Sequence, residues 1–245
     1  MVSDSSSFKT RAVFAGQHIQ SAILFTRLCA KLETNYKGQP PFSIPADVYD
    51  EQKAYVTATI FASVAFLEAA INELFADTAE LQPGELAGTL IEHLNPNVRQ
   101  QMADSWNQGT PRGASFPILE KFNVALRLAG QNKLKDHLYN NADAVIVLRN
   151  ALTHFEPAWT MESNPDLITY YEIYKGTKSR RLNTLRRKFS NPLVLQSEPF
   201  FPNRCLCHAC AEWTVISCLN FAKAFYTSIG ITGYPPRNIM KFPLT

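Results

Sequence analysis

Three polar residues of types suited to phosphate chemistry interrupt an apolar segment in the second half of the chain. Arg149, Asn150 and His154 follow the run AVIVL at residues 144–148 and precede Phe155. Polar groups in such a setting cost free energy unless they are paired or used. An arginine is always protonated, and its planar fork of donors matches phosphate oxygens. A histidine titrates near neutrality, so it can take a proton from a ribose 2′-hydroxyl or return one to a leaving oxygen.

The spacing of these residues suits one face of a helix. At about 100° per residue, with Arg149 at zero, Asn150 falls near 100° and His154 near 140°. Asn150 and His154 are four residues apart, so the amide is in reach of the imidazole. One histidine cannot easily act as both acid and base in a single step, whereas a symmetric dimer would bring two Arg/His pairs into one cleft. The alternative is a histidine that merely pairs with the helix C-terminus.

The secondary structure around these residues is predicted to consist of helices joined by short loops. Apolar residues recur at helical spacing, and Gly, Pro and Asn separate the segments. Asp47 is predicted to cap the long second helix. The pattern predicts an all-α bundle with helices over residues 11–36, 47–79, 86–93, 98–106, 116–128, 136–155 and 205–229.

Two of these helices resemble the signature helices of the HEPN domain family. Residues 141–159 contain Arg149, the polar Asn150 and His154 in the family's Arg-polar-x3-His pattern, and residues 66–75 (FLEAAINELF) resemble its second, acidic helix. The resemblance implies an all-α HEPN-like helical bundle. It also implies a metal-independent RNA endonuclease that acts as a homodimer without cofactors, as a toxin or phage-defence effector with a neutralising antitoxin partner. Other members only bind RNA or nucleotide.

The resemblance also assigns roles to residues of this chain. Arg149 would stabilise the scissile phosphate, His154 would be the acid and base, and Asn150 their polar neighbour. Glu68 or Glu73 would pair with Arg149 or support the site, and the sequence does not choose between them. A non-catalytic RNA- or nucleotide-binding module and a helical interaction protein are the alternatives.

The domain is expected to span residues 11–230, after a disordered lead-in (1–10) and before a tail (231–245). Residues 157–203 are rich in Pro, Asn and Ser and form an irregular basic insertion before the last helix, with a possible strand at 168–174. Its basic residues suit sequence-independent contacts with RNA phosphates, although such runs are often a solvated helix face. The candidate RNA-binding residues are Lys178, Arg180, Arg181, Arg186, Arg187 and Lys188.

Four cysteines crowd the start of the last predicted helix, at positions 205, 207, 210 and 218, while Cys29 is solitary. Structural zinc normally takes two separated ligand pairs, and a C-x-x-C redox motif normally follows a strand. Neither context is present, so buried thiols beside Trp213 and Phe221 are the favoured interpretation, and no metal site is predicted.

Composition is that of a soluble globular protein with a mildly basic net charge of +3. The odd number of cysteines and a polar first nine residues favour a reducing cytoplasm over secretion. The longest apolar run, residues 60–70, contains Glu68 and is short for a membrane span. Since no Gly-rich phosphate loop, G-x-S-x-G or H-E-x-x-H motif occurs, the corresponding nucleotide hydrolases, esterases and metalloproteases lack support.

Overall fold

The structure is a computed structural model that describes residues 12–109, 111–113, 115–154, 185, 188–198 and 200–234. Within these ranges the regular elements are all helical and none is a strand. The predicted all-α fold class is therefore confirmed.

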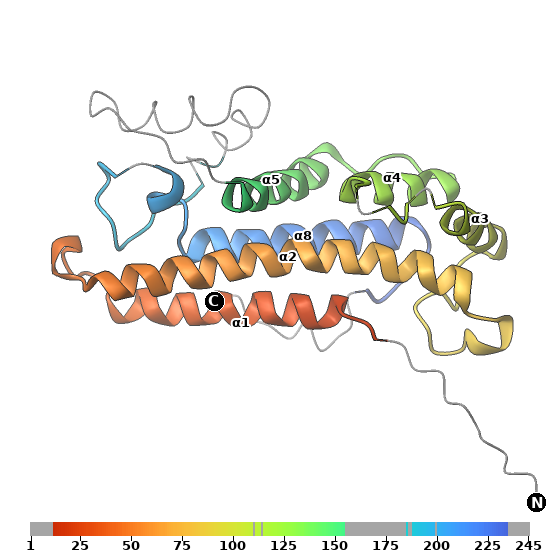
Figure 1. The fold of residues 1–245 in the computed structure, drawn as a ribbon, viewed down its shortest axis with the longest axis horizontal. Helices are drawn as coiled ribbons and strands as arrows, with labels where there is room; N and C mark the ends of the chain where they lie inside the picture. Colours follow the sequence, from red (N-terminus) through yellow and green to blue (C-terminus); the bar gives the residue numbers. More distant parts are fainter. Residues whose placement is uncertain are drawn as a thin grey trace, which may run out of the picture.

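The centre of the bundle is α2 (Ala46–Glu80), which lies alongside α1 (Ala15–Asn35) and α8 (His208–Ser228) (Figure 1). In the described part of the chain, α2 is also the one helix long and apolar enough to cross a membrane, with a window of mean hydropathy 1.7. Half of that window is buried inside the protein. A helix that is apolar on several sides is expected where it packs against more than one neighbour, as α2 does here.

Three further helices follow one another along the other side of α8 (Figure 1). They are α3 (Pro96–Asn107), α4 (Ile118–Leu128) and α5 (Asp136–Thr153), and all three contact α2. The core between the layers is rich in aromatic rings, with Phe122 of α4 edge-on to both Phe221 and Phe225 of α8. This packing holds α4 against α8, and α5 contacts both α8 and α2. The candidate site lies where α4 and α5 meet α2.

The helices of the described chain fall close to their predicted ranges, and the differences have local causes. The second helix is capped by Pro45, whereas Asp47, the predicted cap, lies in its first turn. A carboxylate there is still stabilised by the positive end of the helix dipole. Asn95 caps α3, where its side chain accepts hydrogen bonds from the amides of Asn97 and Val98. Pro117 precedes α4, so that helix starts two residues later than predicted.

The prediction of a helix over residues 86–93 is wrong. That segment is a series of turns after the short 3-10 helix Pro83–Glu85. Gly88 has a φ of +74°, which an α-helix cannot contain. The Glu92 carboxylate accepts a hydrogen bond from the amide of Gly88 at 2.8 Å and holds this turn closed.

The last helix begins at His208 rather than at residue 205. A short π-helical segment, Phe200–Arg204, and an extended Cys207 precede it. The predicted lead-in at 1–10, the possible strand at 168–174, most of the insertion at 157–203 and most of the tail at 231–245 lie outside the described residues.

Candidate functional site

A pocket of about 450 Å³ lies where α2, the start of α4 and α5 meet. Three of the predicted site residues line it, namely Arg149, Asn150 and Glu68. The other lining residues are Ser115, Phe116, Pro117, Ile118, Leu119, Glu120, Tyr139, Asp143 and Ile146. Its volume is within the range of about 300–1,000 Å³ that is typical of small-molecule sites.

The wall contributed by α5 follows from helical periodicity. Tyr139, Asp143, Ile146 and Asn150 are spaced four, three and four residues apart, so they form one stripe along the helix, and Arg149 lies beside its end. The opposite arc of α5 is apolar, with Val145 and Leu148 fully buried. One face thus anchors the helix in the core while the other lines the pocket.

Arg149 brings a buried hydrogen-bond donor without a partner to the pocket. The side chain is half-buried, and its Nε atom is buried without a hydrogen-bond partner in the structure. A buried N–H left unpaired costs about 1–3 kcal/mol, and such groups in native proteins call for an explanation. A ligand acceptor in the pocket would supply the missing partner.

Behind the pocket, Glu68 is supported by a buried lysine. The Lys121 ammonium group lies 3.7 Å from Glu68 Oε1 and donates a hydrogen bond to Asn72 Oδ1 at 3.0 Å. The lysine side chain is 1% exposed and the glutamate side chain 38% exposed. The ammonium is thus enclosed in the protein, while the carboxylate faces the pocket.

Of the two glutamates considered from the sequence, Glu73 lies elsewhere. Its Oε1 accepts hydrogen bonds from the amides of Phe14 and Ala15, at 2.6 and 2.9 Å, at the start of α1. Glu68 is among the described residues that line the pocket, and Glu73 is not. The structure therefore brings Glu68, and not Glu73, to the Arg149 pocket.

His154 is exposed and is not one of the described residues that line the pocket. The helix ends at Thr153, and His154 is its C-cap with φ −113° and ψ 48°. The amide of His154 donates to the carbonyl of Asn150 at 2.9 Å. The sequence predicts a helix through Phe155, whereas α5 ends at Thr153, so the predicted arc with Arg149 does not extend to this histidine.

The candidate RNA-binding residues Lys178, Arg180, Arg181, Arg186 and Arg187 lie outside the described residues. Lys188 is exposed, and its ammonium lies 5.5 Å from the centre of the Trp213 ring on α8. A cation at this distance over an indole is attracted by the ring, so this lysine has a packing role in addition to its charge.

The cysteines are free and buried, as the sequence analysis favoured, but Cys29 is not isolated. It packs in one apolar cluster with Cys205, Cys207 and Cys210. Glu33 Oε1 bridges the two segments, because it accepts from Cys29 Sγ at 3.7 Å and from the amide of His208 at 2.5 Å. Burial raises the pKa of the Cys29 and Cys207 thiols well above the ordinary value. Across the described chain, no group of three or more His, Cys, Asp and Glu residues is arranged to hold a metal ion.

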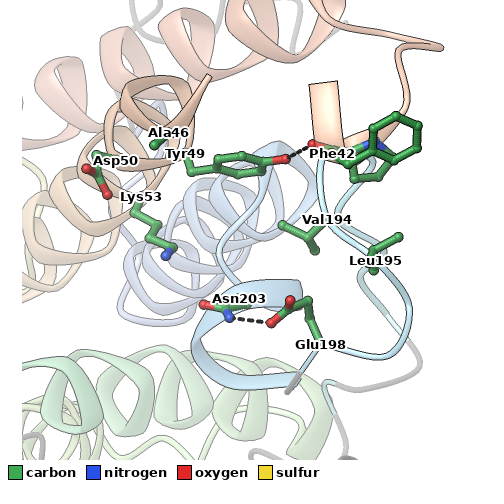
Figure 2. A pocket seen from close by; sticks show the side chains of 10 residues that line it. Phe42, Ala46, Tyr49, Asp50, Lys53, Val194, Leu195, Glu198 and Asn203 are labelled. Carbon is green, nitrogen blue, oxygen red and sulfur yellow. Dashed lines mark hydrogen bonds between the residues drawn. The ribbon is translucent and has the colours of Figure 1, made fainter. Parts of the chain in front are cut away.

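A second pocket of about 400 Å³ lies at the start of α2, against Val194, Leu195, Glu198 and Asn203 (Figure 2). Tyr49 spans its edge, because its hydroxyl donates to the carbonyl of Leu193 at 2.9 Å and is also within hydrogen-bond distance of the Pro41 carbonyl. Phe42 and Leu195 at its rim are 88% and 51% exposed. None of the predicted site residues lines this pocket. In the sequence, this second pocket is signalled only by Phe42 and Leu195, two large apolar residues in polar loops.

Comparison of the chain with models of protein families, with curated proteins and with solved structures finds no match.

Proposed function

We propose that this chain is a metal-independent RNA endonuclease that acts as a homodimer through the end of α5. The observation that carries the proposal is Arg149, with its unpaired buried Nε, at the edge of a polar pocket and five residues before the exposed His154. A guanidinium with an unpaired Nε–H is suited to a phosphate oxygen of a ligand.

The proposed reaction is attack of a ribose 2′-hydroxyl on the adjacent phosphate. His154 takes the proton from the 2′-hydroxyl as the new P–O bond forms. Arg149 stabilises the charge that develops on the phosphate oxygens. The 5′-oxygen leaves with a proton from a second His154, that of the partner protomer, and the product carries a 2′,3′-cyclic phosphate. No step in this scheme requires a metal ion.

The dimer is part of the proposal because His154 lies beyond the pocket of its own chain. A two-fold axis near the end of α5 would bring the histidine of one protomer toward the arginine of the other. The proposed setting is a cytoplasmic toxin or defence effector held inactive by a neutralising protein partner.

The test is cleavage of single-stranded RNA in the presence of a chelator. Arg149→Ala and His154→Ala should each lower the rate about 100-fold or more, and the wild-type product should end in a 2′,3′-cyclic phosphate. Arg127→Ala and His93→Ala are matched controls, because both side chains are exposed and lie away from the pocket. RNA binding by the wild type without any cleavage would instead identify a non-catalytic binding module.

A further inference from the structure

The charges around the Arg149 pocket are unsuited to a phosphate over most of its surface. Glu68, Glu120 and Asp143 line it, against the single cation Arg149 among the described lining residues. Lys121 lies behind Glu68 and neutralises that carboxylate without reaching the pocket surface. A phosphate is therefore favoured only at the Arg149 edge, and the body of the pocket suits a neutral group that carries hydrogen-bond donors.

Glu68 is well placed to accept such donors. Its carboxylate makes an ion pair with Lys121 at 3.7 Å but accepts no hydrogen bond from any described residue. A carboxylate offers two oxygens side by side. Its natural counterpart is a pair of adjacent N–H donors, which allows two parallel hydrogen bonds.

Two aromatic residues complete the pocket. Phe116, just before α4, and Tyr139, near the start of α5, are both half-buried and both line it. Aromatic side chains in RNA-binding sites stack on unpaired bases, and polar groups read the exposed base edges. Stacking contributes about 1–3 kcal/mol per base.

We propose that this pocket holds an unpaired guanine base next to the scissile phosphate. Guanine presents N1–H and an N2 amino group side by side, so it can donate two parallel hydrogen bonds to Glu68. Adenine and cytosine present one amino group beside an acceptor nitrogen, and uracil places carbonyl oxygens on both sides of its single N–H. The inference rests on the proposed ribonuclease function, because it takes the scissile phosphate to lie at Arg149.

The test is a set of oligouridine strands, each carrying a single guanine, adenine or cytosine. Wild-type protein should cleave next to guanine at least tenfold faster than next to any other base. Glu68→Gln should remove most of this preference, because an amide replaces one acceptor oxygen with a donor; a bidentate base contact is worth about 5- to 150-fold. Glu92→Gln is the matched control, since Glu92 is exposed on the turn after η2 (Pro83–Glu85) and away from the pocket. Thermal unfolding of each variant checks that the protein still folds, because Glu68→Gln removes the charge that pairs with the buried Lys121 ammonium.

The outcomes separate this inference from the function on which it rests. Cleavage without a base preference, or with a preference for uracil, would overturn the guanine pocket and leave the ribonuclease in place. If no strand is cleaved, calorimetric titration with guanosine and uridine monophosphates decides. Tighter guanosine monophosphate binding that Glu68→Gln weakens would support the pocket while the ribonuclease fails. Equal or undetectable binding of the two nucleotides would overturn both.

Discussion

Two polar regions inside the bundle differ in how completely their hydrogen bonds are made. Near the start of α2, Gln52 and Asn191 are each 1% exposed and pair their amides with each other in both directions at 3.0 Å. Gln52 also donates to Glu33 at 2.7 Å, and Asn191 donates to the Asn203 carbonyl at 2.8 Å. The amide of Leu193 donates to Asn191 Oδ1 at 3.0 Å. This network joins α1 and α2 to Asn191, Leu193 and Asn203.

The Arg149 pocket is the opposite case. There the Arg149 Nε is buried and unpaired, and the Glu68 carboxylate faces the pocket with only a long contact to Lys121. A satisfied buried network specifies the structure, whereas a buried group without a partner is retained at a cost to stability. The complete network around Gln52 and Asn191 therefore stabilises the fold. In the pocket, Arg149 Nε is left without a partner in the protein, as the proposed ligand site requires.

The largest effect is expected where the network is complete. Asn191→Leu should lower the free energy of unfolding by about 3 kcal/mol, because it leaves the Gln52 amide and the Asn203 carbonyl unpaired, at about 1–3 kcal/mol each. Urea denaturation measures the change. Gln196→Leu in the same segment is the control, since that side chain is exposed. Equal stability of the two variants would mean that the network contributes little.

A smaller effect is expected at the lysine behind the pocket. Lys121→Ala should lower the free energy of unfolding by about 2 kcal/mol, because it removes packing and the partner of Glu68, whose side chain is partly exposed. Lys121→Met keeps the volume without the charge and should cost less, since apolar replacements of buried charges are often tolerated. The expectation fails if the methionine variant is the less stable of the two.

The α-helical bundle could be predicted from the sequence because apolar periodicity and helix-breaking residues are local signals. Periodicity located α2 and α5 to within two residues at each end. The segment 86–93 failed because one residue, Gly88, adopts a positive φ inside an otherwise helical pattern. Such a choice depends on the turn that Glu92 closes rather than on hydrophobic spacing.

The site could be predicted only in part, because it is built by packing between distant segments. The sequence singled out Arg149 and Asn150 from their neighbours, and it narrowed the acidic partner to two positions. Only the orientation of α2 against α5 selects Glu68. The sequence does not single out Lys121, because a lysine on a helix is ordinarily solvated. It does not show that Cys29 joins the other cysteines, because the three that share its cluster lie more than 170 residues away.

A third prediction uses the pH dependence of stability to examine the buried thiols. Burial alone raises the pKa of Cys218 above the ordinary value of about 9, so the thiol stays protonated in the folded protein while the unfolded chain ionises. This contribution to stability is complete below pH 9 and declines as pH rises above it. Between pH 8 and 10 the wild type should lose about 1 kcal/mol more than Cys218→Ala. Parallel curves from urea denaturation at each pH would show that this thiol is not protected.

The smallest effect on stability is expected at Arg149. It tests most directly whether the Arg149 pocket differs from the network around Asn191. Arg149→Met keeps an aliphatic side chain of similar length and removes a guanidinium whose Nε has no partner. The free energy of unfolding should therefore change by less than about 0.5 kcal/mol or should increase, as is found where function is retained at the expense of stability. Arg127→Met, at an exposed arginine of α4, sets the baseline for replacing an arginine in this fold. A loss of about 2 kcal/mol at Arg149 alone would mean that the guanidinium supports the structure, and the pocket would then be no more reserved for a ligand than the network around Asn191.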